Sequence, residues 1–228
     1  MMYNVANCEE IEVNDLWRYK VKVYKDEWVQ QPLEYGYTHY VMGMNAGIKN
    51  GRYQIADSMF AAQCNLPTTI ECWDKDSTVV DISFYGLSMN DDRIFLPEQP
   101  LVGRSSCGNL SYMDGGTNTV AVNPGRLGFP VINYVHFPAG MKQTLHTHPS
   151  QRIGLILQGS GEIELDNGKF FPIETGDVFV MERNTLHNFM CSKGEDVMLF
   201  VFAPDSGTGP TDEVNPLKVR TYVGQQRF

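Results

Sequence analysis

Three histidines in the C-terminal half of the chain have a spacing that could bind a metal ion. His146 and His148 are two residues apart at the end of an extended segment, so strand geometry would place both rings on one face. His187 lies beside another predicted strand. Two imidazoles from one strand and one from its neighbour can cap a divalent metal and leave positions open for substrate or water. A single histidine is more often simply packed or exposed, but three of the chain's five histidines fall into this pattern.

The segments that must position these histidines read as short β-strands separated by turns. Asp114-Gly115-Gly116 and Asp166-Asn167-Gly168 are hairpin signals. Helical periodicity is absent from the longer windows, although 57–63 could form one or two short helical turns. Many short strands with regular turn signals predict an all-β sandwich or barrel. The predicted strands are 17–25, 38–44, 51–58, 68–73, 78–89, 110–113, 119–122, 131–137, 153–157, 162–165, 169–173, 178–181, 186–191 and 197–202, with a further short one at 218–223.

The spacing of glycines and histidines around this group resembles that of the cupins. Gly140, His146, His148 and Gly159 match the first cupin motif, and Gly176 and His187 match the second. The resemblance covers about residues 125–205. It implies a cupin-like jelly-roll barrel in which the three histidines hold a metal inside the barrel mouth.

Three positions depart from the family pattern. Arg152 stands where the family usually has a metal-binding Glu, the Pro-x-Gly of the second motif is Glu182-Arg183-Asn184, and its closing Asn is Cys191. Arginine is permanently charged and cannot ligate a metal, so only a three-histidine site carries over. Loss of the carboxylate weakens metal binding, and an empty barrel is the alternative. Some cupin-like dioxygenases bind Fe(II) with three histidines. The resemblance therefore implies Fe(II) as the metal of this site, with Ni, Mn, Zn and Cu as alternatives.

Arg152 is the first candidate for substrate binding. If its strand keeps its register, Arg152 and Gly154 face the cavity, where the guanidinium could bind a carboxylate, phosphate or enolate. Gly154 would widen the pocket beside it. The alternative is that Arg152 pairs internally, for instance with Glu182 or Glu164.

Four further residues are weaker candidates. Gln151 could reach the metal through a water, and Phe189 should share the face of His187 and form an apolar wall. His136 and Tyr134 share one face of the preceding strand, where either could be a proton shuttle or a partner of a metal ligand. Such residues are more often packed core or rim groups.

The N-terminal half is rich in strand signals but has only one histidine, His39. We therefore expect a strand-rich region at 1–123, a cupin barrel with the metal site at 124–205 and a tail at 206–228. The first region could be a degenerate second barrel, or its strands could wrap the other barrel or build a dimer interface. Residues 88–108 read as a linker.

Composition indicates which partners and which cellular location to expect. The chain has 228 residues and a formal net charge of −9, so neither nucleic acid nor an anionic membrane is expected as the main partner. Five widely spaced cysteines without a Cys-x-x-Cys pair suggest reduced thiols. With no signal-peptide pattern at residues 1–15, we expect a cytoplasmic location.

Together these features favour a mononuclear Fe(II) dioxygenase that acts on a small anionic organic molecule, with the family resemblance implying a homodimer. One alternative is a non-catalytic barrel for sensing or storage, which the missing Glu supports. Another is a lyase or isomerase that uses the same metal as a Lewis acid.

Overall fold

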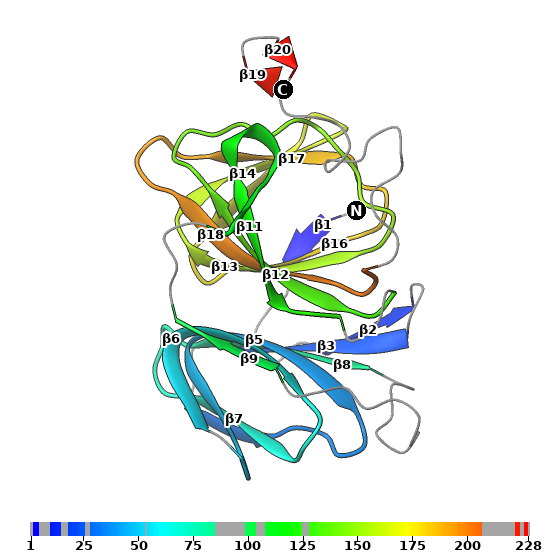
Figure 1. Cartoon of the computed structure of the whole chain (residues 1–228), viewed down its shortest axis with the longest axis vertical. Coiled ribbons are helices and arrows are strands. Elements are labelled where there is room, and N and C mark those ends of the chain that lie inside the picture. The colour runs from blue at the N-terminus through cyan, green and yellow to red at the C-terminus, as the bar shows by residue number, and fades with distance from the viewer. Residues whose placement is uncertain are drawn as a thin grey trace. The chain divides into compact units, whose positions relative to one another are not determined.

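The structure is a computed structural model of the whole chain (Figure 1). It describes residues 2–4, 10–14, 18–25, 28–52, 54–84, 99–103, 108–124, 128–206, 222–223 and 226–227. These residues form β-strands and loops, with one short 3₁₀ turn, η1 (Met113–Gly115), and no α-helix among them. The predicted all-β fold is confirmed. Within the same ranges no helix is long and apolar enough to cross a membrane.

The chain divides into two compact units. Unit 1 comprises Met1–Asn4, Ser105–Val120 and Arg126–Phe228, and unit 2 comprises Val5–Arg104 and Ala121–Gly125. The predicted domain boundaries at residues 123 and 205 stay a prediction. Of the predicted segments, 85–98, 104–107 and 207–221 lie outside the described residues.

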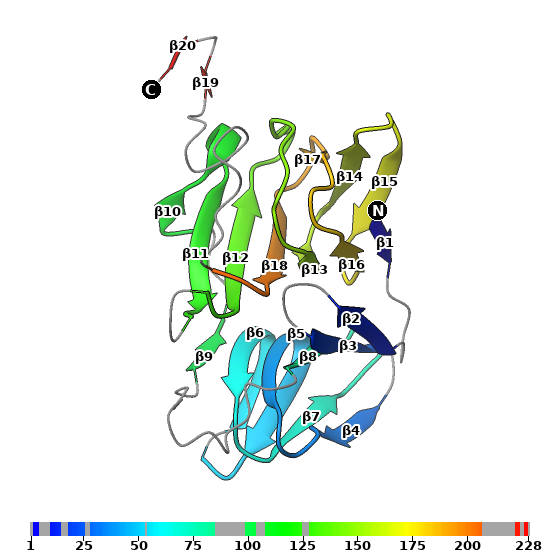
Figure 2. The same cartoon turned by 90° about the vertical axis from the view of Figure 1, so that its right-hand side faces the viewer.

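The main sheets of unit 1 have seven and three strands (Figure 2). The larger sheet has the order β1-β16-β13-β18-β12-β11-β10, and the smaller one β15-β14-β17. Apolar side chains of both sheets meet in a single buried cluster, so the sheets pack face to face as a β-sandwich does. The strands are β1 (Met2–Asn4), β10 (Leu110–Ser111), β11 (Thr117–Val122), β12 (Val131–Phe137), β13 (Arg152–Gln158), β14 (Ser160–Leu165), β15 (Phe170–Glu174), β16 (Val178–Met181), β17 (His187–Cys191) and β18 (Val197–Ala203), with a small separate pair, β19 (Tyr222–Val223) and β20 (Gln226–Arg227).

Unit 2 is built around one long strand. β5 (Thr38–Asn50) pairs with β6 along its length and changes its second partner from β8 to β7 near Asn45, which has a φ of 46°. Because β5 changes partner, β7 and β8 both pair with it, and side chains of all three strands meet in one buried cluster. The remaining strands are β2 (Glu10–Asn14), β3 (Arg18–Lys25), β4 (Val29–Pro32), β6 (Gln54–Cys64), β7 (Thr68–Cys72), β8 (Thr78–Phe84) and β9 (Gln99–Val102).

Two expectations for unit 2 are wrong. Residues 57–63, where we considered helical turns, lie inside β6, and β9 lies within the predicted linker at 88–108. The strand β9 forms by pairing with the end of β6. Residues 59–64 of β6 are all buried, and a run buried on both faces lacks the alternation that identifies a strand.

His39 of unit 2 is a buried ion-pair partner. Its Nδ1 lies 2.8 Å from Asp81 Oδ1 and its Nε2 lies 2.8 Å from the carbonyl oxygen of Glu34. Both contacts are hydrogen-bond acceptors, so both ring nitrogens must carry protons. Burial alone would lower the pKa of His39, but the Asp81 carboxylate and the Glu34 carbonyl outweigh it and raise the pKa.

This pair predicts a pH-dependent stability. The raised pKa makes the contribution of His39 complete below its unfolded pKa of about 6.5, and it is lost as pH rises through the folded pKa. His39→Gln should cost about 3–5 kcal/mol of unfolding free energy at pH 6, and clearly less at pH 9. Urea unfolding at both pH values measures this, and Asp81→Asn should remove the same pH-dependent part. Equal losses at the two pH values would contradict the charged pair.

Candidate metal centre

The three histidines are brought together by backbone pairing with β17. The segment before β13 runs antiparallel to β17, with one bridge between Lys142 and Met190 and another between His146 and His187. In the second bridge each backbone N–H donates to the other residue's carbonyl at 3.0 Å. Residues directly opposite in such a pair project to the same face, so the two rings lie side by side.

His148 is held by the loop between β16 and β17. Asn184 donates its backbone N–H to the His148 carbonyl at 2.6 Å. Asn184 occupies the family's glycine position and has a φ of 58°. Asparagine adopts this left-handed backbone more readily than most residues other than glycine, so the departure keeps the conformation. Gly140, Gly159 and Gly176 of the motifs also have positive φ.

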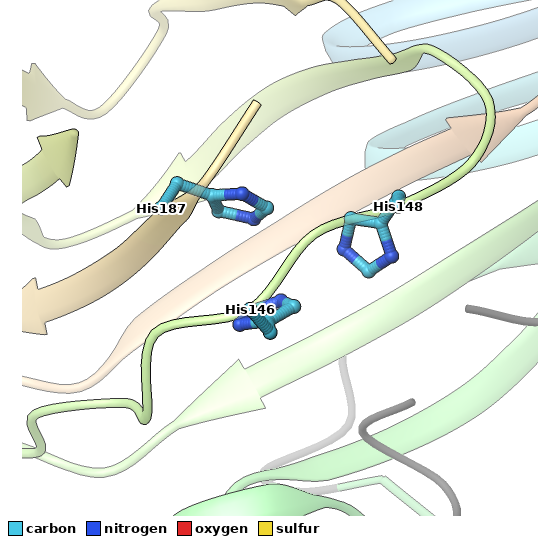
Figure 3. Close-up of side chains that lie close together, drawn as sticks. All are labelled: His146, His148 and His187. Carbon is cyan, nitrogen blue, oxygen red and sulfur yellow. The ribbon is translucent and has the colours of Figure 1, made fainter. Parts of the chain in front are cut away.

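The three rings face a common space (Figure 3). Their centroids are 4.3 Å apart for His146 and His187, 4.8 Å for His146 and His148, and 5.2 Å for His148 and His187. Each offers a ring nitrogen, and these atoms lie within 4.8 Å of one another. Nitrogens at about 2.1 Å from one metal are at most about 4.2 Å apart, so small ring rotations suffice to bind an ion.

Hydrogen bonds leave suitable ring nitrogens for a metal. Nδ1 of His146 and of His187 donates to the carbonyls of Thr144 and Thr185, each at 2.8 Å. A neutral ring that donates from Nδ1 keeps a lone pair on Nε2. Nδ1 of His148 is buried without a hydrogen-bond partner among the described residues, so no protein group there competes for it. The donor set therefore fits a metal ion.

Electrostatics keep all three rings neutral. Burial is the largest cause of the lowered pKa in each. It lowers the pKa of His187 to about 3, with help from the neighbouring His146 and Arg152. The pKa of His148 lies well below its usual value, through burial, Arg152 and the two other histidines. Neutral imidazole is the form that binds metals, so no proton has to leave first.

Arg152 places its charge close enough to act on all three histidines. Its Nη1 donates to the backbone oxygens of Ser150 and Gln151 and to the Ser150 hydroxyl, at 2.8 to 3.0 Å. These hydrogen bonds hold one nitrogen of the guanidinium against the residues that precede Arg152. Of the internal partners that we considered, Glu164 is bound by Lys142 at 3.0 Å and by Asn188 at 3.1 Å.

The strand register gives Gly154 a different role from the one expected. Gly154 pairs with Phe179 on β16, and a Cβ on Gly154 would collide with the Phe179 ring. The ring therefore fills the space that we expected Gly154 to leave open in the pocket. Phe189 does share the face of His187, with the two rings 6.2 Å apart, and it contacts the rings of Phe137 and Phe179.

His136 and Tyr134 are not brought to the histidine group. They lie on the face of β12 opposite Val135 and Phe137, which belong to the core cluster around Phe189. Nε2 of His136 bonds to Asp196 at 2.9 Å, and the Tyr134 hydroxyl donates to the sulfur of Met198 at 3.0 Å. A part for either residue in proton transfer therefore stays a prediction.

Residues that the sequence reasoning did not single out also line this region. Tyr112 packs against the core cluster, and burial raises its pKa to about 12 even though Arg152 lowers it. The buried Gln143 bonds to β17 through both backbone and side chain. Asp114 bonds to Thr144. The only local signal was the Asp-Gly-Gly turn, and nothing in it points to residue 144.

Comparisons with known proteins agree with this geometry. Residues 133–203 match the family model of the cupin domain. No curated protein matches the chain. A cupin 2 conserved barrel domain protein from Leptotrichia buccalis is 16% identical, with 88% of this chain and 91% of that chain covered and a TM-score of 0.54.

Two other solved structures are similar in fold. A salicylate 1,2-dioxygenase from Pseudoaminobacter salicylatoxidans, as an adduct with gentisate, is 10% identical, with 82% of this chain and 68% of that chain covered and a TM-score of 0.53. The protein Ylba from E. coli is 17% identical, with coverages of 87% and 83% and a TM-score of 0.55. Such identities show the fold alone, and coverages above four-fifths extend over both units. The family match shows a cupin domain at residues 133–203, and the similar solved structures show a cupin-like barrel fold that agrees with it.

Proposed function

We propose that this cupin is a mononuclear Fe(II)-dependent dioxygenase for a small anionic organic substrate. The observation that carries the proposal is the group of three neutral histidines with an arginine charge beside it. His146, His148 and His187 would hold the metal. A ferrous ion held there would supply the chemistry of oxygen activation.

The chain's own residues supply binding and orientation. Arg152 attracts a carboxylate or enolate toward the histidines, because its charge acts there in a largely buried site. Phe189 and Phe137 form an apolar wall beside them, which suits a flat or hydrocarbon part of a substrate and excludes water. The gentisate in the dioxygenase neighbour is a small carboxylate of this kind.

Oxygen uptake by the iron-loaded protein tests this proposal. Small carboxylates, with salicylate and gentisate among them, are supplied in turn, and at least one should give iron-dependent oxygen consumption. Turnover without oxygen would show a lyase or isomerase. A bound metabolite with no turnover would show a binding protein. Either result would overturn the dioxygenase assignment.

Arg152→Gln tests the anion site separately. Charge-assisted hydrogen bonds contribute about 1.5–3 kcal/mol, so the variant should raise KM for the anionic substrate by roughly 10- to 100-fold while it keeps its metal. Lys193→Gln removes an exposed charge from another loop and should leave KM unchanged. An unchanged KM in the Arg152 variant would mean that the arginine only fills the site.

A further inference from the structure

The segment that carries His146 contains one extra residue relative to β17. Lys142 is opposite Met190, but His146 is opposite His187, so four steps along one strand match three along the other. This is a β-bulge, and it changes which face the following side chains occupy. The bulge turns His146 to the face of His187, whereas Lys142 lies outside and pairs with Glu164.

The bulge leaves Thr144 without a partner on β17, and Asp114 supplies one. Gln143, which precedes Thr144, and His146, two residues after it, bond through their backbone N–H groups to Phe189 and His187. The Thr144 N–H instead donates to Asp114 Oδ2 at 2.6 Å, and its hydroxyl donates to Asp114 Oδ1 at 3.1 Å. One carboxylate therefore holds the bulged residue at two points.

Thr144 in turn orients the histidine. Its carbonyl accepts the Nδ1–H of His146 at 2.8 Å. The chain of contacts runs from the turn η1 through Thr144 to a ring that faces the metal position. Outer partners of this kind set the tautomer and direction of a metal-binding histidine.

We infer that Asp114 is a positioning residue of the metal centre, which acts through Thr144 to keep His146 protonated on Nδ1 with Nε2 available to the ion. This inference rests on the proposed metal site but concerns a residue far from it in sequence. The carboxylate bonds to the backbone and the side chain of Thr144.

The backbone at Asp114 decides which variant to use. Its φ is 57°, a conformation that glycine adopts freely and alanine does not. Asp114→Gly therefore removes the carboxylate without adding backbone strain. Asp196→Asn is the matched control, because Asp196 also binds one backbone N–H and one side chain, those of Ala139 and His136, away from the histidine group.

Two measurements test the inference. Chelator competition with Co²⁺ should show about a tenfold loss of affinity in Asp114→Gly, at the lower end of the roughly 10- to 100-fold expected for outer partners, and less than a twofold change in Asp196→Asn. In metal-free protein, long-range ¹H–¹⁵N NMR spectra at fixed pH should show His146 as the Nδ1–H tautomer in the native chain and as a mixture in Asp114→Gly.

The outcomes separate the two proposals. Unchanged affinity with an unchanged tautomer in Asp114→Gly would overturn the positioning role while the metal site stands. A native chain that binds no Co²⁺ would count against the proposed metal function, and the tautomer measurement would still decide the role of Asp114. An equal loss in Asp196→Asn would show general destabilisation and would also overturn the inference.

Discussion

Replacing His187 with alanine should abolish tight metal binding. The ring contributes one of three nitrogens that lie within 4.8 Å of one another. Loss of an outer partner already costs about 10- to 100-fold in metal affinity, so loss of a direct ligand should cost at least on the order of 100-fold. Chelator competition or calorimetry with the metal-free protein measures the change.

The matched control is His136→Ala. His136 is also a buried imidazole in unit 1, but it binds Asp196 and Thr117 on the other face of β12. Its removal should lower stability and leave the metal affinity within about twofold. A His187 variant that keeps native affinity, or a His136 variant that loses it, would contradict the assignment of ligands.

Gly154→Ala should strongly destabilise unit 1. The added Cβ would collide with the Phe179 ring, which is fully buried and packs against Phe189. Overpacking of this kind costs about 1–3 kcal/mol, and the upper end is expected because the buried Phe179 ring would have to move. Urea unfolding followed by near-ultraviolet circular dichroism measures the loss.

A second substitution shows whether Phe179 is the cause. Phe179→Leu shortens the colliding side chain, so the double variant should lose less stability than the sum of the two single variants. Gly194→Ala is the control, because a Cβ on Gly194 meets no atom within 4 Å. Additive losses in the double variant would show that the glycine is required for another reason.

Much of the fold follows from local patterns in the sequence. Alternating and β-branched segments bounded by turn residues predicted Val131–Phe137 and Val178–Met181 with their observed bounds. Both hairpin signals in unit 1 lie between strands that do pair, β10 with β11 and β14 with β15. These features depend on a few neighbouring residues, and such signals are visible in a single sequence.

Features that depend on distant pairing could not be predicted in this way. β9 becomes a strand because β6 offers it an edge, and β1 because it pairs with β16. Neither segment carries a strong pattern of its own. The collision partner of Gly154 is likewise set by the register between β13 and β16, which spacing along the chain does not reveal.

The candidate site shows the same division. The His-x-His pair and His187 were identifiable from type and spacing, and the structure brings them together. The link from Asp114 to Thr144 spans thirty residues and depends on a bulge, so no local motif could predict it. His136 matched the expected residue type, but the alternation of β12 places it on the opposite face.

The metal content of the native chain tests the central claim most directly. Protein produced with iron available and purified without chelators should contain close to one equivalent of a transition metal by elemental analysis, and His146→Ala made in parallel should contain almost none. A native chain without metal, or a His146 variant with undiminished metal content, would contradict the three-histidine centre.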